Sequence, residues 1–270
     1  MLIKMIERSL VYPRPSRERG DWRPRLLRPQ NVWFRSADNT KLHGWYVPNA
    51  DARRLVVYCH ANNEHVADQA SLVFRLQSQL SATVFVFDYR GYGRSRGKPY
   101  ERGCVADGMA AQRWLAEREG VSTEDVVMMG RSIGGAVAIA AAAEQGARAV
   151  VVENTFSRMT DVAASMYPWL PVRLVMSNRY NSVRRLQRYE GPLFQCHGTA
   201  DEVVPISLAQ KLFDASPSTL KQFYQVHYGR HNDNPPPDYY AKLSNFLNQV
   251  DGVSSSLAAH LSPRERQLVS

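Results

Sequence analysis

The chain has 270 residues, of which 44% are hydrophobic and 10% aromatic, enough apolar material for one large α/β domain or two small domains. Its net charge is +9, and the first 35 residues hold nine basic against three acidic residues. No signature of a nucleic-acid-binding module accompanies this charge, so we expect no nucleic-acid partner.

Residues 1–30 are predicted to form a basic N-terminal arm. We interpret it as a solvated segment that wraps the domain, with peripheral contact to an anionic membrane as the alternative. The stretch MLIKMIERSLVY places Leu2, Ile6 and Leu10 on one helical face. It is too short and too charged to span a bilayer, which takes about 20 apolar residues. We therefore expect this face to pack on its own domain, with binding in the plane of a membrane as the alternative.

The sequence has an odd number of cysteines and no CxxC pair; they are Cys59, Cys104 and Cys196. We interpret them as free thiols and predict a reducing, cytoplasmic location. The histidines form no H-E-x-x-H motif, and no other metal-ligand spacing is present. We therefore expect neither a metal nor a cofactor.

Strand and helix patterns follow the arm in a regular order. Two strand-like runs at 31–36 and 41–47 predict a hairpin. Further strands are predicted at 54–59, 83–88, 126–129, 149–153, 192–197 and 221–226. Helices are predicted at 65–80, 101–119, 132–145, 205–214 and 239–250. This alternation predicts an α/β fold, with a mostly parallel eight-stranded sheet, helices on both faces and an antiparallel edge.

Residues 31–250 are thus predicted to form one domain. Residues 155–190 interrupt its regular alternation with aromatic residues, prolines and arginines, and are a candidate lid before the next strand. A surface insertion with short helices is the alternative. Residues 251–270 are predicted to be a polar, mobile C-terminal tail.

The segment GRSIGG, residues 130–135, lies between a predicted strand and an alanine-rich helix. A strand–turn–helix of this kind is the context of a nucleophile elbow, which presents Ser132 at the carboxyl end of a central strand. Gly130 and Gly134 would let the strand and the helix pass close together. The pentapeptide alone fits a serine helix cap equally well.

A serine nucleophile needs a base and a carboxylate that orients the base, in the chain order Ser, Asp, His. Asp201 follows the strand at 192–197, and His231 follows the strand at 221–226. Both loops lie where a parallel sheet gathers its site, beyond the carboxyl ends of its strands. Glu153 is the alternative carboxylate and His227 the alternative base. We expect His60 and His197 to brace loops through hydrogen bonds.

Acyl transfer also needs N–H donors for the developing oxyanion. The backbone N–H of Ile133 follows the nucleophile, and the loop HANNEH after the strand at 54–59 offers the backbone N–H of Asn62. The turn DYRGYGRS ends another strand, and we expect its Asp88 and Arg90 to hold loops together.

These motifs resemble the α/β-hydrolase superfamily, in particular the serine-aminopeptidase-like or lysophospholipase-like group that includes protein depalmitoylases. The resembling segments run in family order from about residue 30 to 250 and are HANNEH, VFVFDYRGYGRSRGKP, VVMMGRSIGGAVAIAAA, VVVENTF, YPWLP, PLFQCHGTADEVVP and GRHND.

The resemblance implies an α/β-hydrolase fold with Ser132 as nucleophile, Asp201 as acid and His231 as base. Family members usually have His-Gly-Asn where this chain has Ala61 as the middle residue, which keeps the Asn62 amide in register and adds a Cβ. The depalmitoylases carry an N-terminal cysteine cluster, whereas this sequence has no cysteine before Cys59.

We therefore predict a serine hydrolase that cleaves carboxylic esters or thioesters of small or lipid-like substrates through an acyl-enzyme. A peptidase with the same triad and a non-catalytic binding protein on the same fold are the alternatives. The lid candidate offers apolar side chains for a wall of the substrate pocket, namely Met159, Met166, Tyr167, Trp169 and Leu170.

Overall fold

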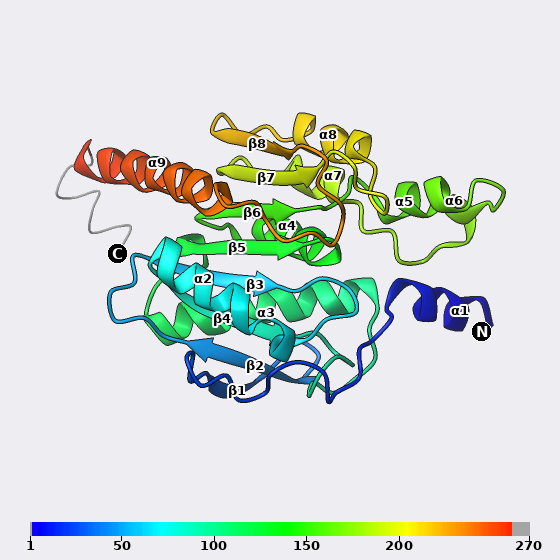
Figure 1. Ribbon diagram of the computed structural model, residues 1–270, viewed down its shortest axis with the longest axis horizontal. Coiled ribbons are helices and arrows are strands. Elements are labelled where there is room, and N and C mark those ends of the chain that lie inside the picture. Colours follow the sequence, from blue (N-terminus) through cyan, green and yellow to red (C-terminus); the bar gives the residue numbers. More distant parts are fainter. Residues whose placement is uncertain (1, 261–270) are drawn as a thin grey trace.

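The computed structural model of the protein describes residues 2–260. An eight-stranded sheet runs through it in the order β1-β2-β4-β3-β5-β6-β7-β8 (Figure 1). The strands are β1 Gln30–Arg35, β2 Lys41–Val47, β3 Arg54–Cys59, β4 Ala82–Asp88, β5 Val126–Arg131, β6 Ala149–Glu153, β7 Leu193–Gly198 and β8 Lys221–Val226. Only the pairs β1–β2 and β2–β4 are antiparallel, and the other neighbours are parallel.

Helices cover both faces of this sheet. In Figure 1, α2 and α9 lie in front of the sheet, and α3 and α4 lie behind it. The helices are α1 Leu2–Val11, α2 Ala70–Leu80, α3 Glu101–Glu119, α4 Ile133–Gln145, α5 Met159–Met166, α6 Val172–Val175, α7 Ser182–Leu186, α8 Ile206–Asp214 and α9 Tyr239–His260, with 3₁₀ turns η1 Val66–Asp68 and η2 Thr123–Asp125. The predicted fold class is confirmed.

The central strands are apolar along their whole length because helices bury both of their faces. All seven residues of β4 are buried, as are all five of β6. One apolar cluster joins the sheet to α3 and α4, and a second joins it to α2 and α9. The parallel strands therefore end together at one rigid edge of the sheet, where the loops that follow them meet.

Two predicted helices differ from the structure. The helix predicted at 65–80 is divided, because the Asp68 carboxylate accepts the His65 N–H at 3.0 Å and closes a separate 3₁₀ turn before α2. Helix α9 continues to His260 rather than ending at residue 250, so the predicted tail begins as helix. Asp251 anchors this extension through ion pairs with Arg54 and Arg148, at 3.0 and 3.2 Å. Residues 261–270 of the predicted tail lie outside the described part of the chain.

The N-terminal helix α1 lies beside the lid candidate, at the edge of the sheet where the parallel strands end (Figure 1). The expectation that its Leu2/Ile6/Leu10 face packs on the domain is wrong for Leu10, which is 65% exposed, while the side chains of Leu2 and Ile6 lie outside what the structure describes. Glu7 and Val11 are buried instead, because the Glu7 carboxylate accepts three N–H groups of Ser177 and Asn178 in the lid candidate. Within residues 2–260, no helix has the length and apolar character to cross a membrane.

The three cysteines are buried and unbridged, as predicted. Burial raises the pKa of the Cys59 and Cys104 thiols to about 12 and also raises the pKa of Cys196. All three thiols therefore stay protonated at neutral pH and act as small apolar groups of the core.

Candidate active site

Ser132 occupies the turn between β5 and α4. Its backbone has φ 54° and ψ −121°, a strained conformation for a residue with a side chain. Three hydrogen bonds hold it: the Ser132 N–H donates to the Glu153 carbonyl at 2.8 Å, and the Ser132 carbonyl accepts the Gly135 N–H at 3.0 Å and the Thr155 hydroxyl at 2.7 Å. Such strain persists only where surrounding contacts impose it, and it points the hydroxyl away from the helix.

Two glycines make this turn sterically possible. A Cβ built on Gly130 would lie 2.3 Å from the Gly134 carbonyl oxygen, and one on Gly134 would lie 2.0 Å from the Cys59 carbonyl oxygen. Both obstacles are backbone atoms, which cannot rotate away as a side chain can. The start of α4 is therefore pressed against the end of β3, next to the loop that carries Asn62.

Substitution Gly134→Ala is therefore expected to destabilise the fold by about 3 kcal/mol. It is also expected to lower activity, because α4 must move away from β3 and take the Ile133 N–H with it. Denaturant unfolding measures the first effect. The matched control is Gly252→Ala in α9, where a new Cβ meets nothing within 4 Å and Ala is expected to stabilise the helix by about 0.5 kcal/mol. A Gly134→Ala protein as stable as the wild type would contradict this account of the turn.

The structure brings the three predicted triad residues together. Ser132 Oγ lies 3.2 Å from His231 Nε2, and His231 Nδ1 lies 2.7 Å from Asp201 Oδ2. Ser132 is half-buried, the His231 side chain is 9% exposed and that of Asp201 is fully enclosed. The three residues come from loops after β5, β7 and β8, so the parallel sheet assembles them from distant parts of the chain. A hydroxyl, an imidazole and a carboxylate in this order can pass a proton from oxygen to nitrogen.

The Asp201 carboxylate is held in its ionised form. Burial disfavours the charge, but the hydrogen bond from His231 and the backbone N–H groups of Val204 and Val203 outweigh burial and lower the pKa of Asp201. These two N–H groups donate to Asp201 Oδ1 at 2.7 and 2.9 Å. Oδ1 is thus occupied by backbone donors, and Oδ2 is directed to the imidazole.

Two residues that the sequence analysis did not single out hold the His231 loop. The His231 carbonyl accepts the Asn154 amide at 2.9 Å and also accepts the Arg131 guanidinium. Asn154 follows β6 with φ 46°, and its side-chain oxygen also accepts the Gly198 N–H at 3.1 Å. The sequence offers one signal for the role of Asn154: an asparagine directly after a buried strand. Asparagine tolerates a positive φ better than most residues do.

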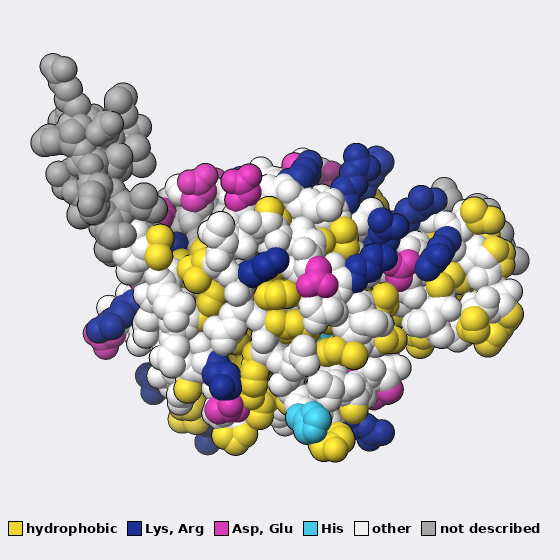
Figure 2. All heavy atoms as spheres, turned by 90° about the horizontal axis from the view of Figure 1, so that it is seen from above, with side chains coloured by type: hydrophobic (Ala, Val, Ile, Leu, Met, Phe, Trp, Pro, Cys, Tyr) yellow, Lys and Arg dark blue, Asp and Glu magenta, His cyan; other side chains and the backbone are white. Residues whose placement is uncertain are grey.

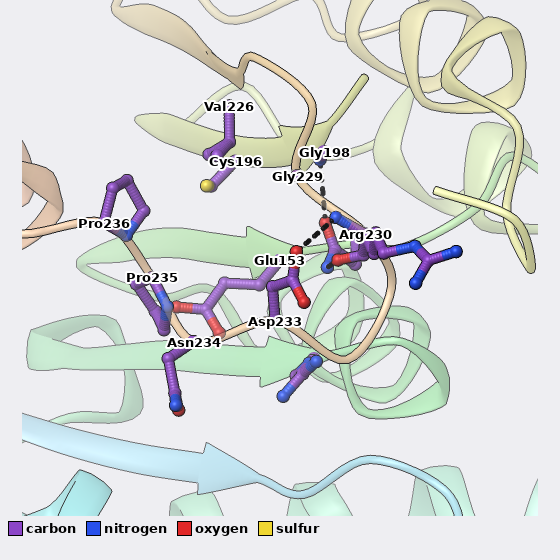
Figure 3. A pocket seen from close by; sticks show the side chains of 12 residues that line it. Glu153, Cys196, Gly198, Val226, Gly229, Arg230, Asp233, Asn234, Pro235 and Pro236 are labelled. Atoms are coloured by element: carbon purple, nitrogen blue, oxygen red, sulfur yellow. Dashed lines mark hydrogen bonds between the residues drawn. The ribbon is translucent and has the colours of Figure 1, made fainter. Parts of the chain in front are cut away.

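Neither alternative residue joins the triad. The Glu153 carboxylate accepts the Tyr239 hydroxyl, and burial raises its pKa. Glu153 lines a small cavity of about 30 Å³ together with Cys196, Asn234, Pro235 and other residues. Figure 3 shows the side chains that surround it. The alternative base His227 is exposed and stacks on Tyr228 with ring centroids 4.2 Å apart.

His60 and His197 brace loops, as predicted. His60 Nδ1 lies 2.7 Å from the Ala61 carbonyl oxygen, and His197 Nε2 lies 2.8 Å from the Val204 carbonyl oxygen. Burial lowers the pKa of both rings, so their neutral forms are favoured. His197 Nε2 also lies 3.4 Å from Asp201 Oδ2, and therefore supports the acid loop from behind.

Asp88 and Arg90 connect loops at the same edge of the sheet. Asp88 Oδ2 lies 3.0 Å from His43 Nδ1, and its Oδ1 accepts the Val66 N–H at 2.9 Å. The Arg90 guanidinium forms ion pairs with Asp107 and Asp38, both at 2.7 Å. The contacts with His43, Val66 and Asp107 are buried, whereas the Asp38 side chain is 48% exposed. Together they confirm that Asp88 and Arg90 hold loops together.

The two predicted oxyanion donors, the backbone N–H groups of Ile133 and Asn62, have no backbone or side-chain acceptor among the described residues. The Asn62 side chain is fixed at both ends: its amide donates to the Val11 carbonyl at 2.6 Å, and its oxygen accepts the Tyr92 hydroxyl at 2.6 Å. Helix α1 thus helps to position the loop that carries Asn62.

Ala61 fits this loop without strain. Its φ is not positive, so the position does not require glycine, and its N–H donates to the Glu64 carboxylate at 3.0 Å. The residue with positive φ in this loop is Asn63, at 57°. The Cβ of Ala61 is therefore compatible with the backbone conformation that presents the Asn62 amide.

The apolar side chains of the lid candidate are placed differently from the prediction. Met159 packs against the core cluster that contains Ile133, but the other four expected wall residues are exposed: Met166, Tyr167, Trp169 and Leu170. They therefore do not enclose a pocket. A narrow apolar crevice lies beside Ile133 instead, too tight to admit a water molecule and lined by Tyr12, Tyr89, Tyr92, Cys104, Val137 and Tyr180.

Comparison with known proteins agrees with this architecture. Residues 54–232 match the sequence pattern of the family described as alpha/beta hydrolase fold. The chain belongs to this family. Within it, an uncharacterized protein of Mycobacterium tuberculosis is 33% identical over 206 residues, which cover 76% of this chain and 73% of that protein. Protein bem46 of Schizosaccharomyces pombe is 29% identical over 261 residues, covering 91% and 87% of the two chains.

The hydrolase fold also appears in a solved structure of similar shape. The Pyrococcus furiosus esterase Pf2001 superimposes with a TM-score of 0.74 at 20% sequence identity, and the superposition covers 88% of this chain and 97% of the esterase. At this identity the likeness establishes a common fold. The eight-stranded sheet and its helices are thus those of an α/β hydrolase.

Proposed function

We propose that this α/β-hydrolase-fold protein is a serine hydrolase that cleaves carboxylic esters or thioesters. The observation that carries the proposal is the hydrogen-bonded chain from Ser132 through His231 to Asp201, with contacts of 3.2 and 2.7 Å, on a strained elbow. A helix-capping serine would not require φ 54°, nor an imidazole beside its hydroxyl. The similarity in fold to the esterase Pf2001 agrees with ester chemistry.

In the proposed mechanism, Ser132 Oγ attacks the acyl carbon while His231 Nε2 takes its proton. Asp201 keeps the proton on Nδ1 and stabilises the imidazolium that forms. The N–H groups of Ile133 and Asn62 bind the oxyanion of the tetrahedral intermediate. His231 then protonates the leaving group and later activates the water that releases the acid. Residues 155–190 act as a lid in this proposal, and residues 1–30 as an arm that braces the Asn62 loop.

The test is a set of substrates with one acyl group and three leaving groups: a p-nitrophenyl ester, a thioester and a peptide amide. We expect kcat/KM for the ester and the thioester to exceed that for the amide, because p-nitrophenolate and thiolate leaving groups depart more readily than an amine. Varying the acyl chain from acetyl to palmitoyl then measures the size of the acyl site. A kcat/KM for the amide comparable to that for the ester would instead identify a peptidase, because an esterase leaves amides almost untouched.

Reaction with a fluorophosphonate provides an independent readout of the nucleophile. A labelled Ser132 without ester turnover would support the site but not the substrate class. A folded protein that hydrolyses none of the substrates and resists the fluorophosphonate would overturn the proposal in favour of a binding protein on this fold.

A further inference from the structure

The segment between α5 and α7 exposes a cluster of apolar side chains at one end of the molecule. We call residues 166–175 the lid tip. Six of its side chains are between 36% and 82% exposed, namely Met166, Tyr167, Trp169, Leu170, Leu174 and Val175. Soluble surfaces rarely expose so many large apolar groups within one short segment, and such patches mark interaction sites.

The exposed charged side chains around the lid tip are positive. Residues 155–188, all of which the structure describes, contain six arginines and one acidic residue, Asp161. Asp161 is buried and pairs with Arg173 at 3.1 Å and Lys211 at 3.5 Å. Arg158, Arg173 and Arg179 are exposed. An apolar tip flanked only by exposed cations is complementary to an anionic surface with an apolar interior.

The lid tip protrudes from the edge of the sheet that carries the site. In Figure 1, α5 and α6 extend beyond the ends of the parallel strands, with α1 beside them. Figure 2 shows hydrophobic side chains at the outer end of this right-hand lobe and, toward the body, several Lys or Arg side chains with one acidic side chain among them. The apolar cluster is thus an outward-facing tip and not a groove that would receive a peptide.

We propose that the lid tip docks on an anionic lipid bilayer. Tryptophan and tyrosine favour the interface between headgroups and acyl chains, where Trp169 and Tyr167 would lie, while Leu174 would enter the apolar region. The flanking arginines would bind anionic headgroups, each adding to the affinity. An acidic protein would match the arginines but would leave the apolar tip without a partner.

This docking does not depend on the proposed hydrolase activity. It lies in residues 166–175 and not in the basic arm of residues 1–30. If the hydrolase activity also holds, docking places Ser132 close to ester substrates that reside in a membrane. The two proposals are tested separately, since vesicle binding requires no turnover.

The experiment uses the full chain with Ser132→Ala, so that lipid is not hydrolysed. Flotation with phosphatidylcholine vesicles, with and without phosphatidylglycerol, measures the partition coefficient. We expect stronger binding to the anionic vesicles, weakened by salt. Adding Trp169→Ser and Leu174→Ser should reduce binding by about tenfold or more, because both side chains lose their apolar contact with lipid.

The matched control carries Leu26→Ser and Phe74→Ser. These side chains are 86% and 48% exposed and lie beside Arg25 and Arg75 on the groove between the arm and α2, so they combine apolar and basic groups in another place. This variant is expected to bind vesicles as the parent does. Loss of binding here and not in the lid-tip variant would overturn the proposal.

Tryptophan fluorescence identifies the inserted residue directly. Lipids brominated on the acyl chain should quench part of the emission, and Trp169→Phe should abolish that quenching. Absence of flotation of the parent protein, or equal flotation of the lid-tip variant, would overturn docking. A dimer in light scattering that the lid-tip substitutions dissociate would assign the tip to contact between copies of the chain instead.

Discussion

Substitution Ser132→Ala is expected to reduce kcat/KM for esters by at least about 10⁴-fold, because it removes the atom that forms the acyl-enzyme. Stability should change little. Ser132 Oγ contacts His231 at 3.2 Å, whereas the contacts that hold the strained backbone come from the main chain and Thr155, which alanine leaves intact. We expect the free energy of unfolding to stay within about 1 kcal/mol of the wild type.

The matched control for this variant is Ser78→Ala. Ser78 is exposed on α2, and its hydroxyl donates to the Arg75 carbonyl at 3.4 Å, so its removal should leave both turnover and fluorophosphonate labelling unchanged. Labelling should disappear only in Ser132→Ala. A folded and fully active Ser132→Ala protein would exclude the proposed mechanism, whatever the substrate.

Substitution Asp201→Asn is expected to lower kcat by about 10⁴-fold through the wrong tautomer of His231. The backbone N–H groups of Val203 and Val204 donate to Oδ1, so an asparagine would place its oxygen there. Its NH₂ group would then face His231 Nδ1 in place of Oδ2. With Nδ1 accepting this hydrogen bond, the imidazole proton moves to Nε2, which can no longer take the proton of Ser132.

The control for this variant is Glu153→Gln, which tests the alternative carboxylate. The Glu153 carboxylate accepts the Tyr239 hydroxyl, and the amide oxygen of glutamine can do the same, so kcat should change by less than about tenfold. Loss of activity in Glu153→Gln with retention in Asp201→Asn would transfer the role of the acid to Glu153.

The comparison of wild type with Asp201→Asn also gives a pH dependence of stability. The pKa of Asp201 is lowered in the folded state, so its carboxylate stabilises the fold above the pKa of the unfolded chain, about 3.9. This contribution is lost as the pH falls through the lower pKa of the folded state. The stability difference between wild type and Asp201→Asn should therefore shrink on acidification. A difference that grows toward low pH would contradict the lowered pKa.

Local patterns were sufficient for the strands of the sheet and for the order of the candidate site residues in the chain. The seven consecutive buried residues of β4 are a mostly apolar run in the sequence, and the glycines around Ser132 mark a tight turn. Both features can be read from the sequence because they depend on residues that are neighbours in the chain. Strands at 41–47, 54–59, 149–153 and 221–226 have the bounds that the sequence predicts. Loops after parallel strands meet at one edge, so the positions of Asp201 and His231 in the chain were enough to predict that they lie near Ser132.

Other features depend on contacts between segments far apart in the chain. The extension of α9 rests on Asp251 with Arg54, and the His231 loop rests on Asn154 and Arg131. Hydrophobic periodicity does not predict such pairs, because each of these polar residues, taken alone in the sequence, is indistinguishable from a residue at the surface.

The sequence by itself determined the α/β class, the tight turn at Ser132 and the order in which Ser132, Asp201 and His231 reach one edge of the sheet, because all three follow from local backbone sterics and from the geometry of parallel strands. Only the tertiary structure decided which face of α1 is buried, what fixes the Asn62 side chain and in which direction residues 166–175 project. Those outcomes depend on which distant groups satisfy one another. Glu7 is buried because lid N–H groups donate to it, and Trp169 is exposed because no other segment packs over the lid tip within the described residues.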